Sequence, residues 1–306
     1  MRGRIQGLQP AMTGPCRAAY DGAVPSPTSG GSRTAAPSAA GSSARSIGAP
    51  VSISGVSKWF PTGRSFLHAL DEIDIEIEPG EFVSLIGPSG CGKSTLLRVV
   101  GGLLPYELGT VTVDGNSPAQ ARDTKQIGFA PQTPSLLGWR TVRRNVTLLA
   151  EVNRRGAIHP PLSESEILEL LETVGLGDFL DRLPKELSGG MQQRVSLVRC
   201  FALGAPVLLM DEPFSALDEI TRNEMRYLLL DLWERTGHTV VFVTHSIPEA
   251  VILSDRVLVM ATKPGRVVHA ETITLPRPRS VQMEDDERYL VHMRNVRRSL
   301  GEVSAR

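Results

Sequence analysis

The sequence is poor in cysteine, lacks any long apolar run and carries no excess of charge of either sign. Its three cysteines, Cys16, Cys91 and Cys200, form no spaced pair or metal-binding pattern, which is typical of a protein of the reducing cytosol. Lys plus Arg and Asp plus Glu each number 33, so nucleic acid is not an expected partner. No apolar run approaches the roughly 18 residues that span a bilayer, and no apolar core of a signal peptide follows the early arginines. We therefore expect neither export nor a membrane span, and any membrane role must depend on a partner protein.

The first 47 residues are dominated by Ser, Gly, Ala and Pro, as in SPTSGGSRTAAPSAAGSSARS. Large apolar side chains are too sparse there to offset the conformational entropy that ordering would cost. We predict a disordered N-terminal tail over residues 1–47. The composition favours an over-long start or a plain linker over a regulatory arm.

Short apolar segments rich in β-branched residues begin at Val51 and alternate with helix-sized stretches. The expected strands are VSISGV, IDIEI, FVSLI, TVTVDG, IGFA, VLLMD, VVFVT and RVLVMA. Helices are expected at residues 94–100, 191–203 and 220–234. Because strands that alternate with helices form largely parallel sheets covered by helices, the sequence predicts an α/β fold.

Two parts of the sequence depart from this alternation. The segments VSISGV and IDIEI have no helix between them, which predicts an antiparallel β subdomain beside the mixed sheet core. Ser163 and Glu166 have the spacing of a capping box, and an apolar stripe at helical spacing follows them. We therefore predict one domain over residues 48–280, with an inserted α-helical subdomain at about 133–187, and a helical C-terminal tail at 281–306.

The stretch GPSGCGKST at residues 87–95 places glycine and proline directly after the apolar segment FVSLI. The pattern G-x-x-x-x-G-K-[ST] between a strand and a helix is typical of a phosphate-binding loop, whose backbone N–H groups and following helix bind the anion. Lys93 is expected to neutralise the β- and γ-phosphates, Ser94 to offer its hydroxyl to Mg²⁺, and Thr95 to bond near the α- or β-phosphate. Cys91 is interpreted as a small side chain that fills space. The loop alone leaves kinases, GTPases and motor proteins open. Its candidate nucleotide-binding residues are Gly87, Pro88, Ser89, Gly90, Cys91, Gly92, Lys93, Ser94 and Thr95.

Two further segments carry residues suited to nucleotide chemistry. In VLLMDEP, the expected strand ends in Asp211, which can hold Mg²⁺ through water, and Glu212, which can orient and polarise an attacking water. In LSGGMQQR, Ser188, Gly189 and Gly190 lie immediately before an expected helix and form a second bare-backbone cradle for an anion. A plain helix cap by Ser188 is compatible with that role. One nucleotide can use both cradles only when they come from different subunits.

The order of these motifs resembles that of the ATP-binding subunits of ABC transporters, over residues 49–275. The motifs are GPSGCGKST, FAPQ with Gln132, LSGGMQQR, LLMDEP, SALD with Asp218, and VTHS with His245. The resemblance implies a P-loop NTPase fold of the ABC ATPase type and hydrolysis of ATP with Mg²⁺. It also implies a homodimer, in which each ATP lies between the phosphate loop of one subunit and residues 188–190 of the other.

The resemblance also implies roles for single residues. Glu212 would be the catalytic base, and His245 would contact the γ-phosphate and hold the attacking water in place. Gln132 would complete the Mg²⁺ coordination and sense the transmembrane partner. Asp218 would tie the two subunits together at the dimer interface. Read without the motif order, His245 is as readily structural as functional.

An aromatic residue near the start of such domains stacks on the adenine. In VSKWF, Phe60 occupies the matching position, and Trp59 is the less favoured choice. Taken alone, an aromatic residue at this position is more often part of the packed core.

Several segments are similar to the importer subgroup for nitrate, sulfonates, taurine and related small solutes. They are LLGWRTVRRNV, MDEPFSALDEITR, THSIPEAVILSDRVLVMATKPGRV and LPRPR. Gly138 stands where a proline is usual and Ser246 where an aspartate is common, but neither departure removes a phosphate contact. Residues 133–146 would contact a transmembrane permease, or pack within the helical subdomain, or do both.

The implied partners are a second copy of the chain, the permease subunits and, indirectly, a solute-binding protein, with the chain peripheral to the cytoplasmic face of the membrane. In such systems the permease and the binding protein select the solute. The alternatives are the ATPase of another importer or of an exporter, an ABC ATPase without a transport role, and a P-loop small-molecule kinase. The last does not account for LSGGMQQR.

Overall fold

The structure, a computed structural model, describes residues 47–152 and 160–304. The predicted N-terminal tail lies, apart from Ile47, outside the described residues. The strands are β1 (Val51–Thr62), β2 (Ser65–Ile77), β3 (Phe82–Ile86), β4 (Leu108–Val113), β5 (Ile127–Ala130), β6 (Val207–Asp211), β7 (Thr239–Val243), β8 (Arg256–Ala261) and β9 (Arg266–Thr272). The α-helices are α1 (Lys93–Val100), α2 (Pro118–Asp123), α3 (Val142–Val152), α4 (Glu164–Thr173), α5 (Gly189–Ala202), α6 (Glu219–Thr236), α7 (Ile247–Leu253) and α8 (Glu287–Ser304). Short 3₁₀ helices are η1 (Gly177–Phe179), η2 (Pro184–Glu186) and η3 (Val281–Asp285).

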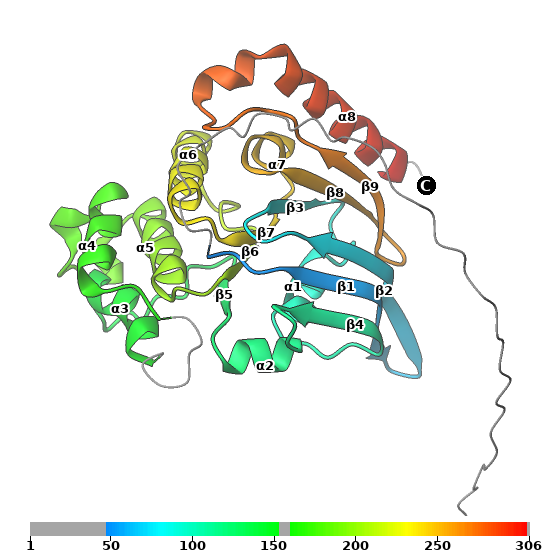
Figure 1. Ribbon diagram of the computed structural model, residues 1–306, viewed down its shortest axis with the longest axis horizontal. Helices are drawn as coiled ribbons and strands as arrows, with labels where there is room; N and C mark the ends of the chain where they lie inside the picture. The colour runs from blue at the N-terminus through cyan, green and yellow to red at the C-terminus, as the bar shows by residue number, and fades with distance from the viewer. Residues whose placement is uncertain (1–46, 153–159, 305–306) are drawn as a thin grey trace, which may run out of the picture. The chain divides into compact units, whose positions relative to one another are not determined.

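Two β-sheets form the scaffold (Figure 1). The smaller sheet has the order β2-β1-β4, and its strand pairs are antiparallel. The larger sheet has six strands in the order β5-β6-β7-β3-β8-β9. Within the described chain, β9 is the strand of that sheet that runs antiparallel to its neighbour. The predicted α/β fold with a mixed sheet core and an antiparallel β part is confirmed.

The side chains of the central strands alternate between two hydrophobic cores. Successive strand residues point to opposite faces, so Val83 and Leu85 of β3 enter one core while Phe82 and Ile86 enter the other. Helix α1 packs in the first of these cores and contacts both sheets. The helix that follows the phosphate-loop stretch is therefore fixed between the two sheets.

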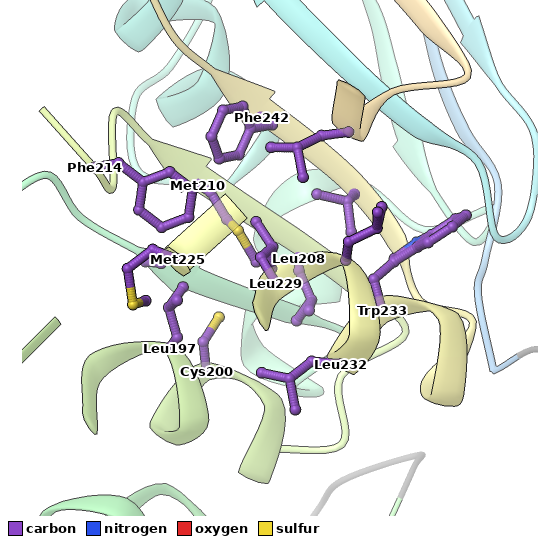
Figure 2. Close-up of a cluster of buried hydrophobic side chains, with 14 of the residues drawn as sticks. Leu197, Cys200, Leu208, Met210, Phe214, Met225, Leu229, Leu232, Trp233 and Phe242 are labelled. Carbon is purple, nitrogen blue, oxygen red and sulfur yellow. The ribbon is translucent and has the colours of Figure 1, made fainter. Parts of the chain in front are cut away.

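The second core lies between the other face of the large sheet and helices α5 and α6 (Figure 2). Each element contributes side chains at its own period, the strands at every second residue and the helices at every third or fourth. The labelled side chains are Leu197, Cys200, Leu208, Met210, Phe214, Met225, Leu229, Leu232, Trp233 and Phe242. Because β6 is buried along its whole length, the carboxylates at its end are held on a rigid element.

Helices α3 and α4 lie in the range predicted for the helical insertion and pack against α5. The predicted capping box is present at α4: the Ser163 hydroxyl accepts from the Glu166 N–H, and the Glu166 carboxylate accepts from the Ser163 N–H at 2.7 Å. The C-terminal helix α8 packs on α7, β8 and β9 (Figure 1). Among the described helices, none combines the length and apolarity that crossing a bilayer requires.

Some element bounds differ from the prediction, and β9, α2 and α7 were not predicted. The helix expected at residues 191–203 begins at Gly189, because the Ser188 side chain caps it and both glycines adopt helical geometry in its first turn. β1 extends to Thr62 and β2 begins at Ser65, because the two strands pair along a hairpin and polar residues do not interrupt that pairing. β9 was not expected because it is an edge strand in which no residue is fully buried, so its sequence mixes polar and apolar residues and contains no apolar run.

Candidate nucleotide-binding site

The candidate site lies where parallel strands of the large sheet end. β3, β7 and β6 are neighbours, and their carboxyl ends lead into residues 87–92, 244–245 and 211–212. Carboxyl ends of parallel strands lie at the same edge of a sheet, which is where open α/β sheets bind ligands. The topology thus brings together three segments that are more than 30 residues apart in sequence.

Glycines are required at several points of the loop between β3 and α1. A Cβ atom on Gly87 would lie 2.5 Å from the Met260 carbonyl oxygen, closer than real Cβ contacts come. Gly90 and Gly92 have φ angles of 79° and 96°, which side chains other than glycine rarely adopt. Gly92 is also the N-cap of α1, so the loop passes directly into the helix N-terminus. The backbone is therefore shaped as a cradle without side chains, which suits close approach by phosphate oxygens.

Lys93 is a buried cation without a counter-ion in the described chain. Its ammonium group donates to the carbonyl oxygens of Gly87 at 2.8 Å and Pro88 at 3.2 Å, and it forms no salt bridge with a described carboxylate. A buried, unpaired charge is costly unless a partner of opposite charge arrives. Cys91 is buried next to it, and burial raises the pKa of its thiol, so it fills space as an inert neutral group.

Ser94 and Asp211 face each other across the site. The Ser94 hydroxyl donates to the Asp211 carboxylate at 2.6 Å, and Arg98 lies 4.0 Å from the other oxygen of that carboxylate. A hydroxyl and a carboxylate are the hard oxygen ligands that Mg²⁺ prefers when substrate phosphates complete its shell. The described residues contain no cluster of three or more carboxylate, histidine or cysteine side chains that could hold a metal unaided. The donor set therefore fits a Mg²⁺ ion delivered with a nucleotide.

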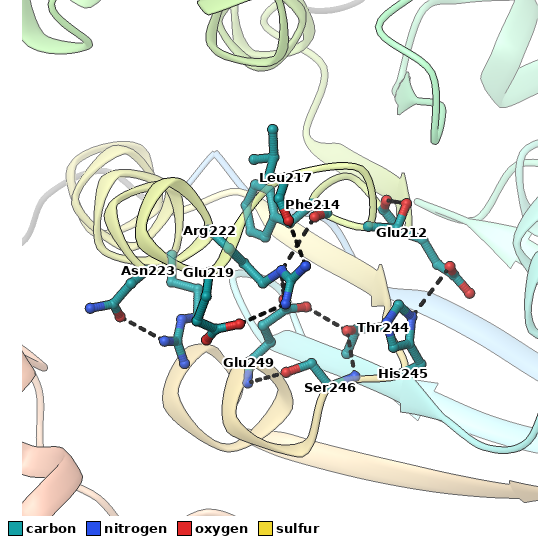
Figure 3. Close-up of polar contacts among 12 residues, drawn as sticks. Glu212, Phe214, Leu217, Glu219, Arg222, Asn223, Thr244, His245, Ser246 and Glu249 are labelled. Carbon is teal, nitrogen blue, oxygen red and sulfur yellow. Dashed lines mark hydrogen bonds and ion pairs between the residues drawn. The ribbon is translucent and has the colours of Figure 1, made fainter. Parts of the chain in front are cut away.

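Glu212, His245 and Gln132 gather beside this pair. Glu212 directly follows β6 and has a φ angle of 46°, a strained value for a residue with a side chain. Its carboxylate lies 3.4 Å from the His245 imidazole, which is 60% exposed (Figure 3). The Gln132 amide donates to the Ser215 hydroxyl at 3.1 Å, and that hydroxyl donates to the Glu212 carbonyl at 3.0 Å. The predicted catalytic side chains thus meet at one sheet edge, with a carboxylate and an imidazole both open to a ligand.

A cavity of about 320 Å³ lies beside the loop; Lys93, Ser94 and Glu212 line it, whereas Asp211, His245 and Gln132 do not. Its lining includes Phe60, Ser89, Gly90, Gly92, Lys93, Ser94, Thr95 and Glu212. Phe60 faces this cavity, with the Lys58 ammonium 5.2 Å from its ring centre. Trp59 instead stacks on His68, with ring centres 4.4 Å apart. The geometry accordingly favours Phe60 over Trp59 as the residue that would stack on the adenine ring of a nucleotide.

Sequence reasoning missed part of the cavity wall. Leu67, His68 and Ala69 of β2 line it, as does Lys263 in the loop after β8. The two segments are held together by backbone bonds, including one from the Gly265 N–H to the Ala69 carbonyl at 3.0 Å. No sequence pattern marks these residues, because long-range packing alone brings the hairpin and the loop together.

Ser188, Gly189, Gly190 and Asp218 are not brought to the phosphate loop. They line a separate cavity of about 560 Å³. The Ser188 hydroxyl accepts from the Met191 N–H at 3.3 Å, which leaves the first N–H groups of α5 open to a ligand. Asp218 caps α6 through the Thr221 N–H, and this bond lowers the pKa of its carboxyl. The described part of one chain therefore holds two separate cradles, each of them incomplete.

A strand–loop–helix phosphate cradle, with Ser94 and Asp211 beside a lysine, defines a P-loop nucleotide-binding protein. The model of the family described as "ABC transporter" matches residues 70–215. The chain belongs to the ATP-binding subunits of the ABC transporter family, as its similarity to the following proteins shows.

Two relatives illustrate the similarity. An "Aliphatic sulfonates import ATP-binding protein SsuB 1" of Xanthomonas axonopodis pv. citri is 47% identical over 71% of this chain and 85% of its own length. A "Taurine import ATP-binding protein TauB" of Rhizobium johnstonii is 46% identical over 66% of this chain and 75% of its own. The predicted family is confirmed.

Solved structures agree with the fold. A dimeric post-hydrolysis state of the ATP-binding cassette MJ0796, bound to ADP and Pi, matches with a TM-score of 0.64 and 34% identity. The match covers 74% of this chain and 100% of that chain. A further dimeric structure of the same cassette matches with a TM-score of 0.63 and 33% identity.

Proposed function

We propose that this chain is the ATP-hydrolysing subunit of an importer for a small solute of the sulfonate or taurine class. The observation that carries the proposal is the presence, on the same chain, of the phosphate loop and of a separate Ser188–Gly190 cradle. The similarity to import subunits for aliphatic sulfonates and taurine supports the solute class. The solute itself would be selected by other subunits, the permease and a solute-binding protein.

The two incomplete cradles support a dimer in which each ATP lies between two chains. Lys93 and the loop N–H groups of one subunit would bind the phosphates from one side, and the first turn of α5 of its partner would close the other. Neither cradle alone surrounds a triphosphate. ATP binding would therefore draw the subunits together, and loss of the γ-phosphate would release them. That cycle of closing and opening would be delivered to the membrane partner.

The residues at the sheet edge support a division of chemical labour. Glu212 would accept a proton from the attacking water, and His245, 3.4 Å away, would hold that water and the γ-phosphate in line. Ser94, Asp211 and Gln132 would hold Mg²⁺. When bound, Mg²⁺ neutralises charge on the phosphates. Asp211 ends β6, Glu212 directly follows it and His245 follows β7, so these side chains are positioned before ATP arrives, as electrostatic catalysis requires.

The exposure of Trp139 supports a role of its surface in contact with the membrane partner. Its side chain is 77% exposed, although an indole ring normally seeks burial. It lies in the segment 133–146, whose neighbouring leucine, Leu136, packs into the core. A permease that covers Trp139 would hold the chain at the cytoplasmic face of the membrane, and solvent exposure of this ring would end in the complex.

Mixing two inactive variants tests the shared-site proposal. Lys93→Ala removes the phosphate lysine, and Ser188→Arg blocks the other cradle, so neither variant alone should hydrolyse ATP. When both are mixed, the Lys93 cradle of one variant meets the intact Ser188 cradle of the other, and phosphate release into water should return. Absence of recovery, although both variants remain folded, would contradict the shared site. Phosphate on a metabolite instead of in water would favour a kinase.

Uptake tests the transport role. Cells that carry the gene and its permease should accumulate taurine or an aliphatic sulfonate, and cells with Glu212→Gln should not. Retained uptake with loss of efflux would favour an exporter.

A further inference from the structure

A network of polar contacts connects the segment that follows Glu212 with the turn that holds His245 (Figure 3). Arg222, in the first turn of α6, reaches back over the segment between Glu212 and Asp218. Its guanidinium donates to the Leu217 carbonyl at 2.6 Å and to the Phe214 carbonyl at 3.4 Å. One planar cation thus fastens the backbone that runs from Glu212, in the first cavity, to Asp218, in the second.

Glu249 continues the network on the side of His245. Its carboxylate lies 3.7 Å from the Arg222 guanidinium and accepts a short hydrogen bond from the Thr244 hydroxyl. That hydroxyl in turn accepts from the Ser246 N–H at 3.0 Å. Thr244 and Ser246 flank His245 in sequence, so Glu249 fixes the turn that presents the imidazole.

The network has a stability cost that packing alone would avoid. The side chain of Glu249 is 6% exposed, and burial raises the pKa of its carboxyl. Apolar residues of matching volume commonly replace such buried ion pairs with no loss of stability. α7 already buries Ala250, Val251, Ile252 and Leu253, so an apolar residue would suit this position. The directional contacts made by Glu249 are what an apolar residue would not supply.

We propose that Arg222 and Glu249 are positioning residues for ATP hydrolysis, which hold Glu212 and His245 in fixed relation to Asp218. The proposal rests on the proposed function. Neither residue lines the cavity beside the phosphate loop; Arg222 contacts the Phe214 and Leu217 carbonyls, and Glu249 contacts the Thr244 hydroxyl. They act through the two backbone segments that they join. A displacement of Glu212 in one cavity would therefore be transmitted to Asp218 in the other cavity.

Glu249→Gln tests the proposal, because it keeps the side-chain size and the acceptor for Thr244 but removes the buried one of the two carboxylates that face Arg222, the other being the exposed Glu219 at 2.8 Å. The matched control is Glu81→Gln, since Glu81 is also largely buried and lies 3.1 Å from Arg256, at the other end of the sheet. We expect kcat for ATP to fall on the order of tenfold to a hundredfold in Glu249→Gln, as in other cases of misplaced catalytic groups. The affinity for ATP should stay unchanged, and Glu81→Gln should keep both kcat and affinity.

A double-mutant cycle separates positioning from a general loss of stability. Arg222→Lys keeps the charge but cannot reach both carbonyls, and Thr244→Val keeps the shape but loses the hydroxyl. Both variants break one chain of contacts, so their effects on log kcat should be less than additive, while their melting temperatures are recorded alongside. These two variants also carry the test when Glu249→Gln does not fold.

Two results would overturn the proposal while leaving the proposed function intact. One is a kcat for Glu249→Gln, Arg222→Lys and Thr244→Val equal to that of Glu81→Gln. The other is a fall in ATP affinity that accounts for the whole loss of turnover. Absence of phosphate release by the unaltered chain would instead refute the proposed function.

Discussion

Replacing Gly87 by alanine tests whether the phosphate loop is built against the neighbouring strand. The added Cβ would lie 2.5 Å from the Met260 carbonyl oxygen and 2.8 Å from the Cys91 sulfur. A carbon and a carbonyl oxygen normally stay about 3.3 Å apart or more, so the loop would have to move by nearly 1 Å. The move cannot be shared easily, because β3 and β8 are paired up to Ile86 and Val259. Overpacking of this kind costs about 1–3 kcal/mol of unfolding free energy.

Two assays read this prediction. For a domain of this size, 1–3 kcal/mol corresponds to a fall in melting temperature of about 2–10 °C. Binding of a fluorescent ATP analogue should weaken as well, because the loop N–H groups leave their places. Gly301→Ala is the control: no atom lies within 4 Å of its Cβ position, and its place in α8 favours alanine. A Gly87→Ala chain that melts and binds nucleotide like the unaltered chain would refute the reasoning.

Further predictions concern charge, catalysis and pH. Lys93→Ala should weaken ATP binding about a hundredfold or more. A charge pair at about 4 Å contributes about 4 kcal/mol at an effective dielectric of about 20, and the loss of the two carbonyl hydrogen bonds of Lys93 offsets part of that energy. Calorimetric titration measures the affinity, and the exposed Lys185→Ala is the control. Glu212→Gln should bind ATP yet stop turnover and accumulate an ATP-bound dimer on size-exclusion chromatography; a monomer with normal turnover would disprove the base assignment. Burial lowers the pKa of His238 to about 3, and its ring nitrogens have no hydrogen-bond partner in the described chain. Because the unfolded chain binds a proton there below about pH 6.5 and the folded chain does not, unfolding free energy should fall as pH drops from about 6.5 to 3, by up to about 1.4 kcal/mol per unit. In urea titrations His238→Leu should flatten that dependence, and an unchanged slope would show that other groups cause it.

The sequence was informative where a function depends on local backbone chemistry. The loop at residues 87–95 needs glycines at fixed places, and the strand and helix that flank it have their own periodicity, so the whole unit could be predicted. The same holds for the Ser163 cap of α4. Residues such as Asp211 and Ser94 were predicted to serve one ion, and their 2.6 Å contact is consistent with that prediction.

The sequence was less informative where a function depends on contacts between distant segments. Glu249 reads as one more polar residue of a short helix, and only the folded chain brings it to Arg222 and Thr244. Lys263 lines the cavity because the loop that carries it is hydrogen-bonded to β2 through the backbone of Gly265. Such pairings follow from sheet order, which no periodicity within a single segment specifies.

The separation of the two cradles on each chain has a genetic consequence. If two copies share each site as proposed, a copy altered at Ser188 would spoil one site of a mixed pair and leave the other whole. When normal and altered copies are made in equal amounts and pair at random, about half of the pairs are mixed and about half of all sites are whole. ATP turnover that falls below about half in a cell making both copies would therefore show that the two sites of a pair must work together.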